Sequence, residues 1–112
     1  MKRNIIHDGV SIKIFETDDP QKVIIHFTDE ITAFNKIKKA VIKDKGIYCN
    51  GISCEISRLL QKGGVPTHFI EQISDTEQLC WKSQVIPMEV IVRNVIAGSM
   101  AQRLGLEEGA GL

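Results

Sequence analysis

The sequence lacks net charge, because 14 lysine and arginine residues are balanced by 14 aspartate and glutamate residues. No global field therefore draws the chain toward nucleic acid or an anionic membrane, and we expect it to bind neither. Any affinity for phosphate must be local. The clearest local bias is a lysine cluster opposed within its segment only by Asp44, and its simplest interpretation is a solvated edge that resists aggregation. The cluster comprises Lys36, Lys38, Lys39, Lys43 and Lys45.

Cysteine is scarce, and long apolar runs are missing. The three cysteines, Cys49, Cys54 and Cys80, show no Cys-x-x-Cys spacing, so we predict buried free thiols and neither a disulfide framework nor a metal site. No apolar stretch approaches the roughly 20 residues that a membrane span needs. Residues 1–8 are too polar for a signal peptide, so a cytoplasmic location is expected.

The length of 112 residues allows one small core, so we expect a single domain over residues 1–112. The chain contains no internal repeats and no low-complexity tracts. Residues 105–112 include three glycines and no pattern that would close a fold, which predicts a frayed end.

Residues 9–16 and 22–28 predict a β-hairpin. In the first range Val10, Ile12 and Ile14 recur with the period of two that is typical of a strand with one buried face. The second range is rich in β-branched and aromatic residues. Residues 17–20, Thr-Asp-Asp-Pro, are typical of the turn between them.

Residues 50–62 predict an amphipathic helix. Ile52, Ile56, Leu59 and Leu60 recur at helical spacing, and two glycines and a proline follow the range. Further strand-like ranges are 67–73, 77–84 and 88–96, and a short helix is expected after Ser99. Strands in sequential runs around one long helix indicate an α+β fold with an antiparallel sheet and a helix on one face.

Two charges interrupt the most apolar of these strand-like ranges. On a strand, Glu89 and Arg93 would share one face, either as an ion pair on a solvated surface or as part of a site. Ser99 follows where the next helix would be capped, and a helix start offers free N–H groups to an anion. With Arg103 one turn later, the pattern favours a receptor for a phosphorylated small molecule.

Residues 85–99 resemble the first signature of the SAICAR synthase family. The shared pattern is two hydrophobic residues, Pro, a hydrophobic residue and Glu, leading to Arg, three residues and Ala-Gly-Ser. Further similar segments occur in the same order, so the resemblance spans essentially the whole chain. They are residues 32–35, 45–46, 64–70, 75–79 and 103–109.

The resemblance implies the amino-terminal part of the family fold, which is similar to the small lobe of a kinase. The family joins L-aspartate to the carboxylate of a phosphoribosyl aminoimidazole, using ATP and magnesium, through an acyl phosphate. The implied ligand-binding residues are Arg93, Asn94, Gly98, Ser99, Glu89 and Arg103. The residues implied to border a nucleotide are Gly9, Lys13, Lys82, Val85 and Met88.

Two departures from the family pattern bear on catalysis. The family carries Gly-Lys-Ala-Lys where this chain has Gly9, Val10, Ser11 and Ile12, so two ammonium groups near the ATP phosphates are missing. Lys13 is a poor substitute because a shift of one residue along a strand points the side chain to the other face. The family's chains also continue into a part with the acidic residues associated with magnesium, which has no counterpart here.

Three hypotheses follow. The first is a non-catalytic binding protein, expected to form a homo-oligomer, that sequesters or senses a phosphorylated nucleotide or ribotide, for example a signalling nucleotide in a phage–host setting. It needs no cofactor and no catalytic residue. The alternative is a fragment or one half of a split SAICAR synthase, a carbon–nitrogen ligase that would need ATP and Mg²⁺. The third is a remnant that merely folds.

Overall fold

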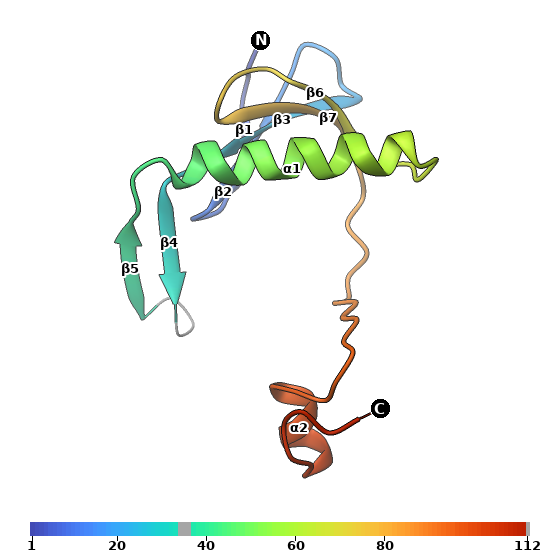
Figure 1. The fold of residues 1–112 in the computed structure, drawn as a ribbon. Helices are drawn as coiled ribbons and strands as arrows, with labels where there is room; N and C mark the ends of the chain where they lie inside the picture. The colour runs from blue at the N-terminus through green and yellow to red at the C-terminus, as the bar shows by residue number, and fades with distance from the viewer. Residues whose placement is uncertain (34–36, 112) are drawn as a thin grey trace.

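The computed structural model describes residues 1–33 and 37–111, and Figure 1 shows how their elements are arranged. A five-stranded antiparallel sheet has the order β1-β2-β3-β7-β6, and helix α1 lies against it. The predicted α+β class is therefore confirmed. The strands of this sheet are β1 (Ile5–Asp8), β2 (Ile12–Glu16), β3 (Lys22–Phe27), β6 (Phe69–Gln72) and β7 (Glu77–Trp81). The other elements are strands β4 (Glu30–Ala33) and β5 (Lys38–Val41) and helices α1 (Lys45–Lys62) and α2 (Ser99–Leu104).

The predicted hairpin is confirmed as β2 and β3, which pair from Ile12 opposite Phe27 to Glu16 opposite Val23. Its turn is held by the Thr17 side chain, whose hydroxyl donates to the Asp19 carbonyl at 2.8 Å. Strand β1 extends the sheet beyond the predicted hairpin.

The β4–β5 hairpin was not predicted from the sequence. Strand β5 is exposed along its length and carries Lys38 and Lys39, in keeping with the predicted solvated edge. Lys36 of that cluster, and part of the family-like segment 32–35, lie outside the described residues.

Helix α1 begins five residues before the predicted start because a distant carboxylate holds its first turn. Asp29 accepts hydrogen bonds from the Gly46 N–H at 2.8 Å and the Asp44 N–H at 3.2 Å. The helix start also lies close to the end of β3, where a Cβ on Gly46 would come within 2.5 Å of the Phe27 carbonyl oxygen. A larger residue would push the helix away from the sheet.

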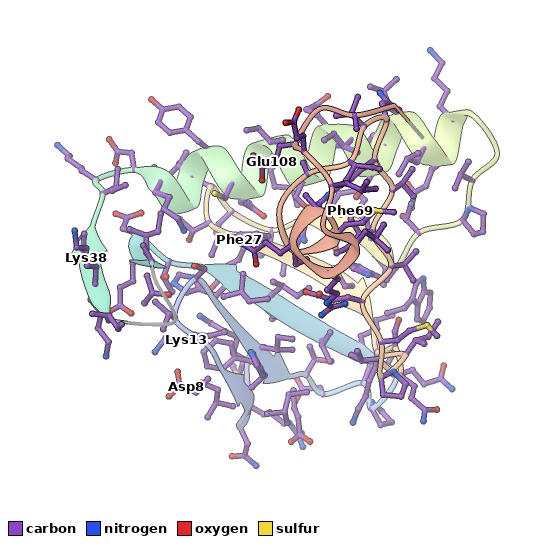
Figure 2. The ribbon with its side chains drawn as sticks, turned by 90° about the horizontal axis from the view of Figure 1, so that it is seen from below. Asp8, Lys13, Phe27, Lys38, Phe69 and Glu108 are labelled. Atoms are coloured by element: carbon purple, nitrogen blue, oxygen red, sulfur yellow. The ribbon has the colours of Figure 1, made fainter. Side chains whose placement is uncertain are left out.

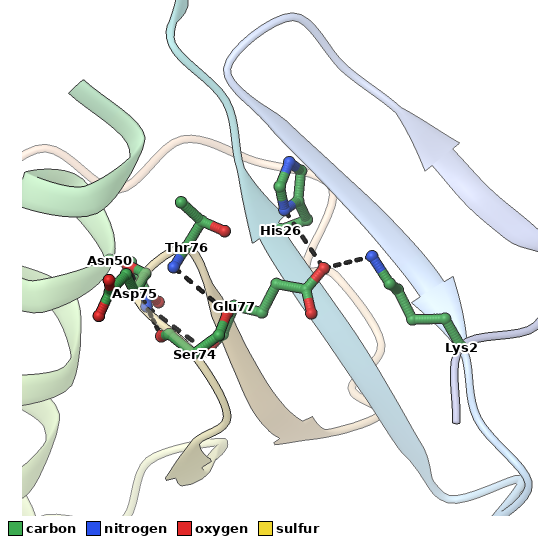
Figure 3. Close-up of polar contacts among 7 residues, drawn as sticks. All are labelled: Lys2, His26, Asn50, Ser74, Asp75, Thr76 and Glu77. Atoms are coloured by element: carbon green, nitrogen blue, oxygen red, sulfur yellow. Dashed lines mark hydrogen bonds and ion pairs between the residues drawn. The ribbon is translucent and has the colours of Figure 1, made fainter. Parts of the chain in front are cut away.

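The apolar stripe of α1 points away from the sheet. Ile52 and Leu59 are 60% and 69% exposed, whereas Asn50 and Cys54 are fully buried. The Asn50 side-chain amide donates to the carbonyls of Ser74 and Asp75, both at 3.0 Å, as Figure 3 shows. The helix is thus anchored by polar contacts to the loop before β7, and the stripe is left uncovered by the described residues.

The prediction of a strand over residues 88–96 is wrong. Strand β7 ends at Trp81, and the chain leaves the sheet as an extended arm that ends in α2 (Figure 1). The arm comprises residues 82–95, and no ladder forms along it because no other described strand runs beside it. Within the described residues, no helix is long and apolar enough to cross a membrane.

The predicted frayed end is also wrong. The chain after α2 turns back, and Ile96 donates to the Ala110 carbonyl at 3.0 Å while Gly109 donates to the Ile96 carbonyl at 2.7 Å. Val95 bridges to Gly111. These contacts bury Ile96 and Ala101, so the glycine-rich tail closes a small folded unit around α2.

Candidate functional site

A pocket at the far end of the arm brings together three of the predicted ligand-binding residues. Arg93, Ser99 and Arg103 line a hollow of about 480 Å³. The remaining walls are the apolar side chains of Ile91, Val92, Met100 and Leu104. Two guanidinium groups on an apolar lining suit a ligand with an anionic group and an apolar or aromatic body.

Gly98 sets the position of the Arg93 guanidinium. Its backbone has φ 58° and ψ −135°, a conformation that a residue with a Cβ rarely adopts. A Cβ there would also lie 3.3 Å from Arg93 Nη1. The Arg93 guanidinium donates to the carbonyl of Ala97, four residues later. The Ala-Gly-Ser sequence therefore holds the guanidinium beside the start of α2.

The predicted cap at Ser99 is wrong by one residue. Gly98 is the N-cap of α2, and no side chain caps the helix. The Gly98 N–H donates instead to Glu108 Oε1 at 2.8 Å, across the turn that the tail makes. A carboxylate of the chain itself therefore accepts from the N–H of the residue that precedes the helix. Glu108 was missed because the tail was expected to fray.

Glu89 and Asn94 do not join the pocket. Both are exposed, and neither belongs to its lining. The ion pair considered between Glu89 and Arg93 is not formed, because Arg93 turns to Ala97 and residues 88–96 do not make a strand. A ligand role for Glu89 and Asn94 stays a prediction.

The residues predicted to border a nucleotide are spread over two places. Gly9 and Lys13 lie at the β1–β2 turn, while Lys82, Val85 and Met88 lie on the arm. Lys82 lines a polar hollow of about 320 Å³ with the β2–β3 turn. Figure 2 shows Lys13, at the β1–β2 turn, well separated from Glu108, which follows α2 at the far end of the arm. In the described residues, the two groups do not form one pocket.

Lys13 is neutralised by a neighbour on the opposing strand. Its Nζ lies 2.9 Å from Asp8 Oδ1, and Figure 2 shows the two side chains next to each other. The hydrogen bond to Asp8 and the charge of that carboxylate raise the pKa of Lys13. Since Val10 and Ile12 stand at the family's lysine positions, this turn offers little free positive charge to a phosphate.

Glu77 joins a polar cluster on the sheet that sequence reasoning missed. Glu77 Oε1 lies 3.3 Å from His26 Nδ1 and also pairs with Lys2 (Figure 3). No local signal could have found it, because the partners come from distant parts of the sequence. Within residues 1–33 and 37–111, no group of three or more His, Cys, Asp or Glu side chains could hold a metal ion.

The fold and the pocket define a small α+β unit with a pocket lined by two arginines at the end of an extended arm. The family model described as SAICAR synthetase matches residues 5–112, and the chain belongs to this family.

The curated relatives include two clostridial phosphoribosylaminoimidazole-succinocarboxamide synthases. The Clostridium kluyveri protein is 55% identical over 111 residues, which cover 99% of this chain and 47% of the relative. The Clostridium acetobutylicum protein is 53% identical over 108 residues, which cover 96% of this chain and 46% of the relative. The chain therefore spans about half the length of the curated relatives it matches.

Solved structures give the same fold. The synthase from Ehrlichia chaffeensis matches 97% of this chain and 46% of its own, with a TM-score of 0.86 and 42% identity. A SAICAR synthetase in complex with ADP matches the same shares, with a TM-score of 0.87 and 38% identity.

Proposed function

We propose that this chain, on its own, is a non-catalytic binding protein that takes a small phosphorylated ribotide or nucleotide and sequesters it. The observation that carries the proposal is the convergence of Arg93, Ser99 and Arg103 on one pocket. A relative whose structure contains ADP supports this ligand class. A signalling nucleotide in a phage–host setting belongs to the same class.

The β1–β2 turn supports the non-catalytic part of the proposal. Phosphoryl transfer needs positive charge held around the transferring group. Val10 and Ile12 carry none, and the ammonium of Lys13 is paired with Asp8. The proposal therefore expects binding without ligation.

Titration calorimetry with ADP, AMP, SAICAR and cyclic nucleotides tests the proposal. We expect heat from at least one of them, and Arg93→Ala should weaken that binding by about 2 kcal/mol, or roughly 30-fold, because a charged hydrogen-bond donor is lost. Arg58→Ala is the matched control, since Arg58 lies on α1 and pairs with Glu55. Unchanged affinity in Arg93→Ala would remove the pocket from the proposal.

A second candidate is one half of a SAICAR synthase, and the sequence identity favours it. The identity of 55% extends over 99% of the chain, arm and α2 included, and the relative is a synthase. This candidate needs ATP and Mg²⁺ as well as the part of the enzyme that the chain does not span. Turnover by the 112-residue chain alone, with ATP, Mg²⁺, aspartate and carboxyaminoimidazole ribotide, would overturn the non-catalytic proposal.

The self-association expected from the sequence stays a prediction. Sedimentation velocity of the purified chain tests it, and a monomer at all concentrations would contradict it. The exposed stripe of α1 gives such association an apolar surface.

A further inference from the structure

One peptide group beside the pocket is held at both of its ends. The carbonyl of Ala97 accepts a hydrogen bond from the Arg93 guanidinium. The N–H of the next residue, Gly98, donates to Glu108 Oε1 at 2.8 Å. Both groups belong to the same planar peptide unit, because Ala97 supplies its carbonyl and Gly98 supplies its N–H. The peptide therefore lies between a carboxylate and a guanidinium.

The two charged groups favour the same orientation of this peptide. A carboxylate at the N–H and a guanidinium at the carbonyl are both aligned with the dipole of a peptide group. Hydrogen bonds in such a chain polarise one another, so each of the two strengthens the other. The Glu108 carboxylate can therefore act on the Arg93 guanidinium through the peptide.

Gly98 allows this peptide a second orientation. Its backbone has φ 58° and ψ −135°, but a glycine adopts negative φ as readily as positive φ. The peptide that precedes Gly98 can therefore rotate and point the Ala97 carbonyl away from Arg93. In that orientation the guanidinium loses its acceptor, and its side chain regains rotamer freedom. The hydrogen bond to Glu108 favours the orientation in which Arg93 is held.

The turn that carries Glu108 is fixed by its own backbone. Gly109 donates to the Ile96 carbonyl at 2.7 Å, and Ile96 donates to the Ala110 carbonyl at 3.0 Å. These contacts do not use the Glu108 side chain. The side chain can therefore be replaced while the tail stays in place.

Glu108 does not belong to the lining of the pocket, whereas Arg93 does. We propose that Glu108 is a positioning residue that orients the Arg93 guanidinium for an anionic ligand group, and that it acts through the peptide between Ala97 and Gly98. The effect on a ligand rests on the proposed binding function, and the orientation of the peptide does not. The tail thus contributes to the pocket without lining it.

NMR of the ligand-free chain tests the orientation of the peptide. In Glu108→Ala the amide exchange of Gly98 should be about 10-fold faster, because its acceptor is gone. The side-chain N–H signals of Arg93 should shift in the same variant. Exchange at Ile96 and Gly109 should stay as in the wild type, which would show that the tail keeps its fold.

Two matched variants show whether the accepting oxygen is what matters. Glu108→Gln keeps an oxygen that accepts from Gly98, so exchange at Gly98 should stay within about 3-fold of the wild type. Glu107→Ala removes the neighbouring exposed carboxylate and should change neither the Gly98 exchange nor the Arg93 signals.

Calorimetry with AMP tests the consequence for a ligand. Glu108→Ala should weaken AMP binding about 10-fold, because Arg93 is no longer held, and Glu108→Gln should weaken it less. Because Glu108 acts through Arg93, adding Glu108→Ala to Arg93→Ala should cause no further loss. Adenosine lacks the phosphate and should bind the wild type and Glu108→Ala equally, whereas a general loss of structure would weaken both ligands.

Three results would overturn the positioning role. The first is unchanged Gly98 exchange in Glu108→Ala, and the second is faster Gly98 exchange with unchanged Arg93 signals. The third is a double variant in which the losses of Glu108→Ala and Arg93→Ala add, because Glu108 would then act independently of Arg93. A wild-type chain that binds no AMP would count against the proposed function alone, since the ligand-free measurements still decide whether Glu108 positions Arg93.

Discussion

The sheet with α1 and the arm with α2 contain similar apolar residues, which are buried in the sheet and exposed on the arm. In the sheet, Val23 and Ile24 on β3 are buried against β7 and α1, and the helix contributes polar anchors to the same interior. In the arm, Val90 and Val92 are as apolar and as β-branched, yet they are exposed. The difference shows that an apolar run in the sequence predicts a segment that favours burial, but does not predict which other segment will cover it. The sheet finds its partners within residues 5–81, and residues 89–94 of the arm pair with no strand among the described residues.

The largest expected effect is the loss of the polar anchor of α1. Asn50→Ala removes a fully buried side chain that donates to the carbonyls of Ser74 and Asp75, so two hydrogen bonds and buried packing are lost and the free energy of unfolding should fall by about 3 kcal/mol. Urea unfolding followed by the fluorescence of Trp81, the single tryptophan, measures it. Asn94→Ala on the exposed arm is the control and should change stability by less than about 0.5 kcal/mol. Equal losses of stability in Asn50→Ala and Asn94→Ala would contradict the difference between the sheet and the arm.

The next effect should be confined to the α2 end. Gly98→Ala forces a Cβ into a left-handed backbone conformation beside Arg93, at a local cost of about 2 kcal/mol. Amide exchange at Ile96 and Gly109, which pair across that end, should therefore speed up roughly 30-fold. The control is Gly105→Ala, where φ is also positive but no atom lies within 4 Å of the added Cβ, and it should have a smaller effect. Destabilisation seen by Trp81 fluorescence would mean that the two regions unfold together.

Local patterns predicted the hairpin of β2 and β3, the existence of α1 and the meeting of Arg93, Ser99 and Arg103. Each depends on short spacings that the chain itself fixes. The orientation of α1 was not predictable, because Asn50 finds its carbonyl partners about 25 residues away and overrides the apolar stripe. The role of Asp29 at the helix start and of Glu108 at Gly98 was hidden for the same reason. Residues 88–96 have the pattern of a strand, but a strand exists only where another strand pairs with it.

The smallest expected effect is a difference between the two regions in how their stability depends on pH. All three cysteines lie in the sheet region, and burial raises the pKa of Cys80 to about 12 and that of Cys54 in the same direction. Above pH 9 the unfolded chain loses these protons while the folded chain keeps them, so the free energy of unfolding should fall as the pH rises from 9 toward 12. Cys80→Ala should make that fall less steep, as measured by urea unfolding at each pH. Exchange at Ile96 and Gly109, corrected for the intrinsic effect of pH, should show no such loss, because the described arm and α2 contain no thiol. An equal loss of stability in the sheet region and at Ile96 and Gly109 would show that the α2 end depends on the sheet for its stability. The two regions would then differ only in the burial of their apolar residues.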